Sequence, residues 1–301
     1  MKKVCGMNGF GRFGIHFLRY YLKNLNKNKF VLKYINDSKL SFDKIKKIIK
    51  NDKYVKLQNF DLKFKKDSLV FYASSKNKLE IIFTNDKINK IWWSPLIDYY
   101  LECSGEKLNK FNFLMNKYKN INNLILSATS HEASKTLIYG FNHKEYNKKY
   151  KTISYGSCTV NAFVPIANSI NKNYKIKDCD VNVIHNLPEY KINENTNNLE
   201  RRFCTLSSSG PKLLKFLNKK NFNVNYTLVP YTGPSMMDIR FKISKKPKSL
   251  DNVVTKIKNN LKKIYDFDKK DKNSNEYKFI ETNLNIILSN SSLKNNNIYL
   301  S

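Results

Sequence analysis

The stretch KVCGMNGFGRFG, residues 3–14, decides the fold. The apolar run within residues 3–8 predicts a short buried strand. Three glycines follow, Gly9, Gly11 and Gly14, and the apolar side chains of residues 15–22 recur at helical spacing. A strand that turns through G-x-G-x-x-G into a helix is typical of a parallel sheet that binds a dinucleotide.

The chain beyond this helix completes a β-α-β unit. Residues 30–35 predict a second strand, which ends at Asn36 and Asp37. The glycines allow the backbone to approach a pyrophosphate, and the helix N-terminus offers it amide donors. Asp37 is placed to accept hydrogen bonds from the adenosine ribose, and its charge would repel a 2′-phosphate, so NAD is preferred to NADP. The alternative is a glycine-rich turn in another α/β protein, with Asp37 as a helix cap.

The rest of the chain alternates strands and helices and then changes character near Ser157. The first part predicts a Rossmann-type doubly wound parallel sheet of the α/β class, and the second an α+β catalytic domain. We therefore expect an NAD-binding domain over residues 1–157 and a catalytic, substrate-binding domain over 158–301. The expected strands are 97–103, 123–127, 151–154, 180–185, 224–229 and 236–243, and the expected helices are 41–50, 107–118, 159–171 and 250–264.

Charge and composition narrow the class of protein. The 301 residues include 55 lysines and arginines and carry a formal net charge of +31. Arginine is the residue that most often recognises phosphates and bases, yet only five of the 55 basic residues are arginine, at positions 12, 19, 201, 202 and 240. We interpret the lysine and asparagine excess as compositional drift on solvated faces. A specific nucleic-acid surface is not expected, although non-specific polyanion binding at low salt is.

Targeting and cysteine patterns favour the cytoplasm. No run of eighteen apolar residues predicts a membrane span, and the N-terminus lacks the continuous apolar region of a signal peptide. The five cysteines are widely spaced and form no C-x-x-C pair, which argues against a disulfide framework and a zinc site. We expect reduced thiols and no metal.

One of these cysteines precedes a helical stretch. A thiol at a helix N-terminus is expected to have a lowered pKa, and the same amides can hold an oxyanion on an attacked carbonyl. Cys158 is therefore a candidate nucleophile, with His185, at the end of an apolar strand, as its base. The alternative is a core cysteine and an incidental histidine.

Several segments, in the same order along the chain as in the family, together resemble glyceraldehyde-3-phosphate dehydrogenases. They are NGFGRFG at 8–14, IND at 35–37, YGFNHKEY at 139–146, SCTVN at 157–161 and SSSG at 207–210, with Val229-Pro230 and Asp238. The resemblance covers roughly residues 1 to 265.

The resemblance implies a reaction and a set of sites. Cys158 would attack glyceraldehyde 3-phosphate, and His185 would take the thiol proton and assist hydride departure to NAD. Inorganic phosphate would then cleave the thioester to 1,3-bisphosphoglycerate, a step of glycolysis and gluconeogenesis, in a homotetramer. The implied phosphate site is Ser157, Thr159, Ser209 and Gly210, and the implied cofactor contacts are Phe10, Gly11, Arg12, Phe13, Asp37 and Ser127.

The departures from the family cluster on the phosphate side. Pro188 and Tyr190 stand where the family has threonine and aspartate, and Leu228 replaces an arginine. Each lost charge-assisted bond is worth about 1.5–3 kcal/mol, which weakens recognition of a phosphorylated aldehyde. Arg201 or Arg202 matches another family arginine, and sequence alone does not choose between them. The loop 185–210 is shorter than the family pattern and the chain stops at Ser301, so tetramer assembly and nicotinamide contacts are less secure.

Two other functions remain open. A related dehydrogenase would oxidise a different aldehyde, such as erythrose 4-phosphate or a semialdehyde. A non-enzymatic protein would use the basic surface to bind RNA or polyphosphate, and its role would survive Cys158→Ser.

Overall fold

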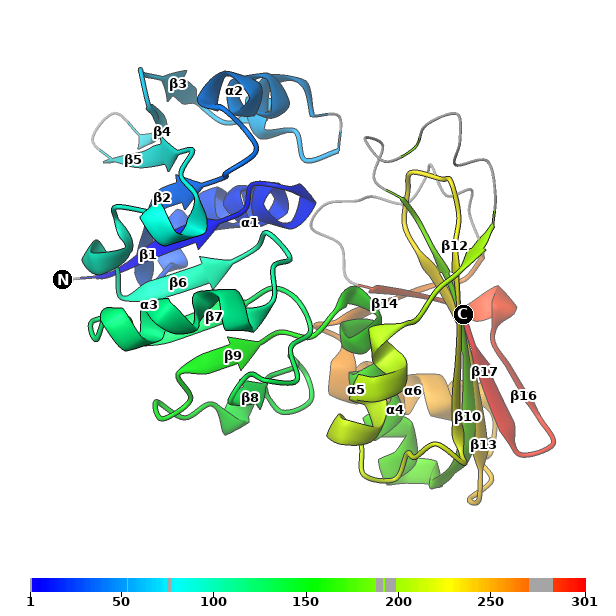
Figure 1. The fold of residues 1–301 in the computed structure, drawn as a ribbon. Coiled ribbons are helices and arrows are strands. Elements are labelled where there is room, and N and C mark those ends of the chain that lie inside the picture. Colours follow the sequence, from blue (N-terminus) through cyan, green and yellow to red (C-terminus); the bar gives the residue numbers. More distant parts are fainter. Residues whose placement is uncertain (1, 53, 75–76, 188–191, 193–198, 271–283) are drawn as a thin grey trace. The chain divides into compact units, whose positions relative to one another are not determined.

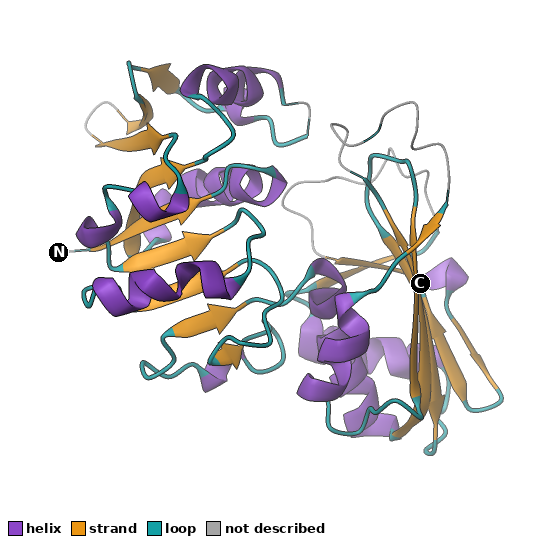
Figure 2. Ribbon diagram, in the orientation of Figure 1, coloured by secondary structure: helices purple, strands orange, loops and turns teal. Residues whose placement is uncertain are grey.

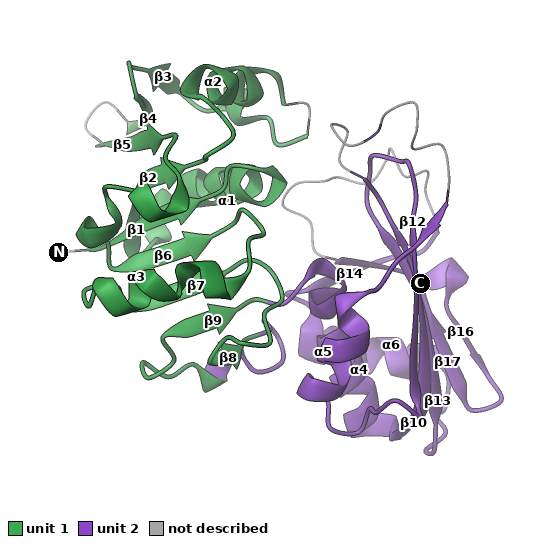
Figure 3. Cartoon of the chain, viewed as in Figure 1, with its two compact units in different colours: residues 1–137, 145–155 green, residues 138–144, 156–301 purple. Residues whose placement is uncertain are grey.

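The computed structural model describes residues 2–52, 54–74, 77–187, 192, 199–270 and 284–301. The chain divides into two compact units (Figure 3). Unit 1 comprises residues 1–137 and 145–155, and unit 2 comprises residues 138–144 and 156–301. The segment 138–144 thus belongs with the second unit although it precedes the end of the first. The assignment of NAD binding to residues 1–157 and catalysis to 158–301 stays a prediction.

Unit 1 consists of one sheet with helices packed against it (Figure 1). Its strands are β1 (Lys3–Asn8), β2 (Phe30–Asn36), β3 (Leu62–Phe64), β4 (Ser68–Ser74), β5 (Asn77–Thr84), β6 (Tyr99–Glu102), β7 (Asn123–Leu126), β8 (Lys135–Thr136) and β9 (Thr152–Ser154). Its α-helices are α1 (Arg12–Lys23), α2 (Phe42–Asn51) and α3 (Asn112–Lys117).

The strand order in this sheet is β3-β4-β5-β2-β1-β6-β7-β9-β8, and the strands from β5 to β8 run parallel. The order turns back between β1 and β6, since the chain moves outward from β1 first through β2 and then through β6. Parallel crossovers are right-handed, so α1 and α3 cover opposite faces (Figure 2). The predicted α/β class with a doubly wound parallel sheet is confirmed. Such a sheet binds ligands at the carboxyl ends of its strands, where the order reverses.

Unit 2 has a mixed sheet with helices on one face. Its helices are α4 (Cys158–Tyr174), α5 (Thr205–Leu213) and α6 (Leu250–Leu261). Its strands are β10 (Ile176–His185), β11 (Glu200–Arg201), β12 (Phe222–Leu228), β13 (Met236–Ile243), β14 (Tyr265–Asp268), β15 (Leu284–Ile287), β16 (Ser292–Lys294) and β17 (Asn297–Leu300). The main sheet has the order β11-β12-β10-β13-β17-β16, and β14 pairs with β15 separately.

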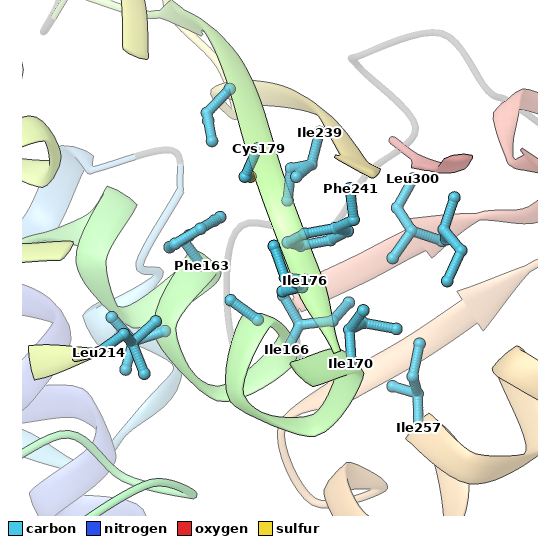
Figure 4. Packing of buried hydrophobic residues seen from close by; sticks show 14 of the residues in the cluster. Phe163, Ile166, Ile170, Ile176, Cys179, Leu214, Ile239, Phe241, Ile257 and Leu300 are labelled. Atoms are coloured by element: carbon cyan, nitrogen blue, oxygen red, sulfur yellow. The ribbon is translucent and has the colours of Figure 1, made fainter. Parts of the chain in front are cut away.

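The core of unit 2 lies between this sheet and the helices (Figure 4). Phe163 of α4 stacks on Phe241 of β13 with ring centroids 6.0 Å apart, and both side chains are fully buried. Alternate residues of β10, Cys179, Val181 and Val183, are buried in the same cluster. Because side chains alternate along a strand, His185 projects from the same face of β10, toward the helices.

One stretch differs from the sequence-based expectation, and another had no assigned element. The segment up to Gly210 was expected as loop, but helix α5 begins at Thr205. Its serines bond back to the preceding turn, since Ser207 Oγ donates to Cys204 O at 2.6 Å and Ser208 Oγ to Thr205 O at 3.1 Å. Serine favours loops unless such bonds satisfy its hydroxyl. In the C-terminal stretch β17 pairs antiparallel with β13, which places the end of the chain in the main sheet.

Candidate active site

The nucleophile candidate is the first residue of α4. Ser157 caps this helix, because its Oγ accepts a hydrogen bond from Val160 N at 3.3 Å. The cap fixes where the helix begins and leaves the first-turn amides directed out of the helix end. Cys158 is exposed, whereas the next side chain, Thr159, is buried. The thiol thus projects from a helix N-terminus where a ligand can reach it.

His185 lies against this thiol. Its Nε2 is 3.3 Å from Cys158 Sγ, and its Nδ1 is 2.8 Å from the carbonyl oxygen of Asn186. A carbonyl only accepts, so Nδ1 carries the proton in the neutral ring and Nε2 keeps its lone pair. The lone pair then faces the S–H group. This is the arrangement that a base needs to take the proton from a thiol.

The surroundings of the sulfur oppose the lowered thiol pKa that the helix start predicts. The protein surrounding the sulfur raises the pKa of Cys158, and the amide groups of Thr159 and Cys158 only partly oppose that rise. Desolvation, which disfavours the thiolate, raises the pKa more than the amides at the helix start lower it. The thiolate therefore depends on transfer of its proton to His185.

Hydroxyl groups gather beside the start of α4. Ser157 Oγ lies 3.0 Å from Thr159 Oγ1 and accepts a hydrogen bond from Thr205 Oγ1, also at 3.0 Å. Ser209 is buried in α5, and none of the described residues offers its Oγ a hydrogen-bond partner. The predicted phosphate-site residues Ser157 and Thr159 are thus together, joined by Thr205, which the sequence reasoning missed. Its signal was weak, a threonine in a stretch read as loop.

Gly210 has a packing role in the same helix. A Cβ there would lie 2.7 Å from Cε1 of Phe222 in β12, closer than real contacts allow. The glycine lets α5 approach the sheet, which brings the hydroxyls of α5 near α4. Its part in binding phosphate stays a prediction.

The glycines of unit 1 have three different surroundings. Gly9 has φ +97°, and a Cβ there would lie 2.4 Å from Ser104 N. At Gly14 a Cβ would be 2.4 Å from the carbonyl oxygen of Gly9. At Gly11, the N-cap of α1, it would meet nothing within 4 Å. Two glycines therefore close the turn, and the third leaves open space in front of uncapped helix amides, which suits a pyrophosphate.

Asp37 lies beside this turn. Its Oδ2 accepts from Phe10 N at 2.8 Å, and its Oδ1 accepts from the backbone of Lys39 and Leu40. The carboxylate therefore joins the end of β2 to the glycine turn, and oxygen lone pairs remain for a ribose hydroxyl. Asp37 does not cap α2, since Ser41 is its N-cap residue.

The other predicted cofactor residues differ in burial and in their contacts. The Phe10 ring is fully buried and packs edge-on against Phe83. Arg12, in the first turn of α1, directs its side chain to Asp52, with Nη1 2.7 Å from Oδ2. Phe13 is exposed. Ser127 follows β7 and donates its N–H to the carbonyl of Glu102 at 2.9 Å.

A buried polar network, absent from the sequence predictions, crosses the carboxyl ends of the strands. Asn8 Nδ2 donates to Glu102 Oε2 at 2.8 Å, and Asn36 Nδ2 donates to Asn8 Oδ1 at 2.8 Å. Thr84 Oγ1 donates to Asn36 Oδ1 at 2.7 Å. The network therefore links β6, β1, β2 and β5 below the glycine turn. Its signal in the sequence was a polar residue at the end of each apolar strand.

Burial raises the pKa of Glu102 to about 7, against the hydrogen bonds from Ser104 and Asn8, which lower it. Ser104 donates to Oε1 through both its backbone N–H, at 2.6 Å, and its hydroxyl. The residue that approaches Gly9 is thus held by this carboxyl group.

The phosphate-side departures are described only in part. Pro188 and Tyr190 lie outside the described residues. Leu228 is buried and pairs with His185 in the register of β10 and β12. Arg202 is exposed and binds Glu200 through Nε and Nη2, at 2.6 and 2.7 Å. Arg201 is exposed on β11.

Two general features concern metals and membranes. In the described ranges no three His, Cys, Asp or Glu side chains gather as a metal site. None of the helices that the structure describes is long and apolar enough to cross a membrane.

Comparison with known proteins finds distant relatives among the glyceraldehyde-3-phosphate dehydrogenases. No family model matches the chain. It is similar to glyceraldehyde-3-phosphate dehydrogenase of Ogataea parapolymorpha, with 28% identity over 62% of this chain and 54% of that protein. Glyceraldehyde-3-phosphate dehydrogenase 1 of Bacillus cereus is 24% identical over 62% and 53%, and the Echinococcus multilocularis enzyme 24% over 86% and 78%. The chain spans about half the length of the first two. The similarity supports a family like that of the glyceraldehyde-3-phosphate dehydrogenases.

The surroundings of Gly9 and Gly11 predict that one alanine substitution lowers stability and the other lowers NAD affinity. Gly9→Ala should destabilise unit 1 by about 2–4 kcal/mol through strain and overlap with Ser104. Gly11→Ala should change stability by less than about 1 kcal/mol but weaken NAD binding, since the methyl group enters the open space. Both tryptophans, Trp92 and Trp93, lie in unit 1, so their fluorescence reports its unfolding, and calorimetric titration reports NAD. Unchanged NAD affinity in Gly11→Ala would contradict this assignment.

The buried carboxyl of Glu102 predicts a pH-dependent stability. Its pKa is raised above the usual 4.5 to about 7, so the folded state holds the proton more tightly. The stabilisation is present below about pH 4.5 and is lost as pH rises to 7, by as much as about 3 kcal/mol. Urea unfolding of wild type and Glu102→Gln at pH 5 to 8 measures it. The stability advantage of wild type over the variant should shrink with pH, and a constant difference would refute the linkage.

Proposed function

We propose that this protein is an NAD-dependent oxidoreductase that converts glyceraldehyde 3-phosphate and inorganic phosphate to 1,3-bisphosphoglycerate. The observation that carries the proposal is the 3.3 Å separation of Cys158 Sγ and His185 Nε2 at the start of α4. The similarity to glyceraldehyde-3-phosphate dehydrogenases supports the reaction class.

The first step is attack on the aldehyde. His185 Nε2 takes the proton of Cys158, and the sulfur bonds to the aldehyde carbon as the carbonyl π bond opens onto its oxygen. The protonated Nε2 then returns its proton to that oxygen, which gives the thiohemiacetal and restores the neutral imidazole. The amides at the start of α4 stabilise the developing negative charge on the carbonyl oxygen. His185 then accepts the hydroxyl proton of the thiohemiacetal as its carbon is oxidised.

The cofactor fits unit 1, where Gly11 leaves space and Asp37 offers a carboxylate. When bound, NAD supplies the acceptor for the hydride that leaves the thiohemiacetal. Gly9 and Gly14 shape the turn, the backbone amides of α1 bind the pyrophosphate, and Asp37 holds the ribose.

Inorganic phosphate completes the reaction. A thioester on Cys158 is attacked by a phosphate oxygen, the carbon–sulfur bond breaks, and the acyl phosphate leaves. The hydroxyls of Ser157, Thr159 and Ser209, with Thr205 behind Ser157, are suited to hold the attacking phosphate. The buried Ser209 Oγ supports this role, because an unsatisfied buried hydroxyl is costly without a ligand.

The setting of the reaction is part of the proposal. Thiolate chemistry requires a reduced Cys158, which a reducing compartment such as the cytoplasm maintains. Assembly as a homo-oligomer, a tetramer by resemblance, and a place in glycolysis or gluconeogenesis rest on the similarity alone.

A second candidate is oxidation of a different aldehyde by the same chemistry. The buried Leu228 favours it, since this position beside His185 offers an apolar side chain instead of a cation. Erythrose 4-phosphate and small semialdehydes are then the aldehydes to compare. Faster turnover of one of these than of glyceraldehyde 3-phosphate would replace the first choice.

Activity should depend on the pair and on phosphate. Cys158→Ala should abolish NADH formation from glyceraldehyde 3-phosphate, NAD and phosphate, and His185→Asn should slow it by about 10²–10⁴-fold. Without phosphate the wild type should release a burst of NADH near one equivalent of enzyme, because the thioester accumulates. Absorbance at the NADH band measures both.

Cys179→Ala is the matched control, since this buried thiol lies in β10 away from the chemistry. It should keep the burst. Activity that persists in Cys158→Ala would rule out Cys158 as the nucleophile, and absence of NADH formation in the wild type would end the enzyme proposal. A steady rate without phosphate would point to hydrolysis in place of phosphorolysis.

A further inference from the structure

An aromatic side chain that the proposed chemistry does not use lies beside the base. β10 and β12 are parallel neighbours, with Val183 opposite Tyr226 and His185 opposite Leu228. Side chains alternate along strands, so Val183, His185 and Tyr226 share one face of the sheet. The ring centroids of His185 and Tyr226 are 5.3 Å apart, and their planes are inclined by 34°.

The imidazole therefore has three neighbours on three different sides. Asn186 O accepts from Nδ1, Cys158 Sγ faces Nε2, and the Tyr226 ring lies beside the imidazole with its plane inclined by 34° to it. The hydrogen bond to Asn186 sets the tautomer. It does not by itself hold the ring plane, because the terminal torsion of histidine has broad minima. The aromatic contact restricts that rotation.

We propose that Tyr226 is a positioning residue for His185: its flat ring holds the imidazole plane so that Nε2 stays aimed at Cys158. This inference rests on the proposed function of the Cys158–His185 pair. Tyr226 acts through His185, and its hydroxyl takes no part.

The surroundings of Tyr226 support a role for the ring. The side chain is half-buried and packs against the core of unit 2, so it is anchored independently of His185. Burial raises the pKa of Tyr226 to about 12, with a smaller contribution from Cys158. The phenol thus stays neutral over the working range of pH, and phenylalanine reproduces the same face.

Charged and titratable groups around the pair must be kept constant in any test. Cys158 is at the start of α4, and Cys204 is the N-cap residue of α5. Tyr226 is in β12, Glu200 is in β11, and Arg202 follows β11. Substitution of Tyr226 by an uncharged residue leaves the other four in place. A changed reactivity of Cys158 then reports the ring and not a lost charge.

The experiment measures alkylation of Cys158 by iodoacetamide against pH, without NAD or aldehyde. Wild type is compared with Tyr226→Phe, Tyr226→Leu, Tyr226→Ala and His185→Gln, and Cys158→Ser gives the background from the other thiols. Tyr226→Phe should match wild type. Tyr226→Ala and Tyr226→Leu should react roughly three- to tenfold more slowly at pH 7, with midpoints shifted toward that of His185→Gln. Leucine keeps apolar bulk on the strand, so it separates lost flatness from lost packing.

Each other outcome overturns the proposal. Wild-type behaviour of Tyr226→Ala or Tyr226→Leu would show that no flat ring is needed, and loss in Tyr226→Phe would assign the effect to the hydroxyl. Equal profiles of wild type and His185→Gln would remove the base on which the proposal acts. Failure of the proposed function is seen separately, as absent NADH formation with an intact alkylation profile.

Discussion

The contact between Cys158 and His185 depends on where one helix begins and where one strand ends. Ser157 fixes the start of α4 through its bond to Val160 N. β10 is held on both edges, by β12 and β13, and its inward side chains are buried under α4. Neither element can shift without disturbing the core of unit 2. A displacement of about 1 Å is enough to impair such a pair, so the packing is a condition of the chemistry.

The proposed cofactor site of unit 1 has a different physical basis. The geometry there comes from the backbone, since Gly9 and Gly14 remove the side chains that would block the turn. The polar network through Asn8 and Glu102 then fixes the ends of the strands below it. Backbone amides bind phosphate oxygens with little dependence on side-chain identity. This allows the surface sequence to change greatly while the binding turn is kept.

Local features were predictable from the sequence, and long-range ones were not. The glycine turn and Asp37 could be located because their signals lie within one β-α-β unit. Cys158 and His185 could be named as a candidate pair from a helix start, a strand end and the family resemblance. Their contact across 27 positions depends on the register of β10 in a sheet, which the sequence does not specify. The pairing of β17 with β13 and the ring contact at Tyr226 depend on strand neighbours that are distant in sequence. Helix α5 was missed because its serines have no helical preference until their hydroxyls bond the preceding turn.

The net charge of +31 attracts anionic ligands from a distance, whereas Leu228 can influence only a ligand in direct contact with it. A basic protein attracts anionic ligands from solution, but at physiological ionic strength the attraction decays within about 8 Å. It raises the encounter rate of any phosphorylated compound and selects none of them. Selection requires donors at hydrogen-bond distance, such as the hydroxyls of Ser157 and Thr159. A chain rich in lysine therefore gains encounters with phosphates, while in the proposed reaction discrimination between aldehydes would depend on the few side chains beside His185.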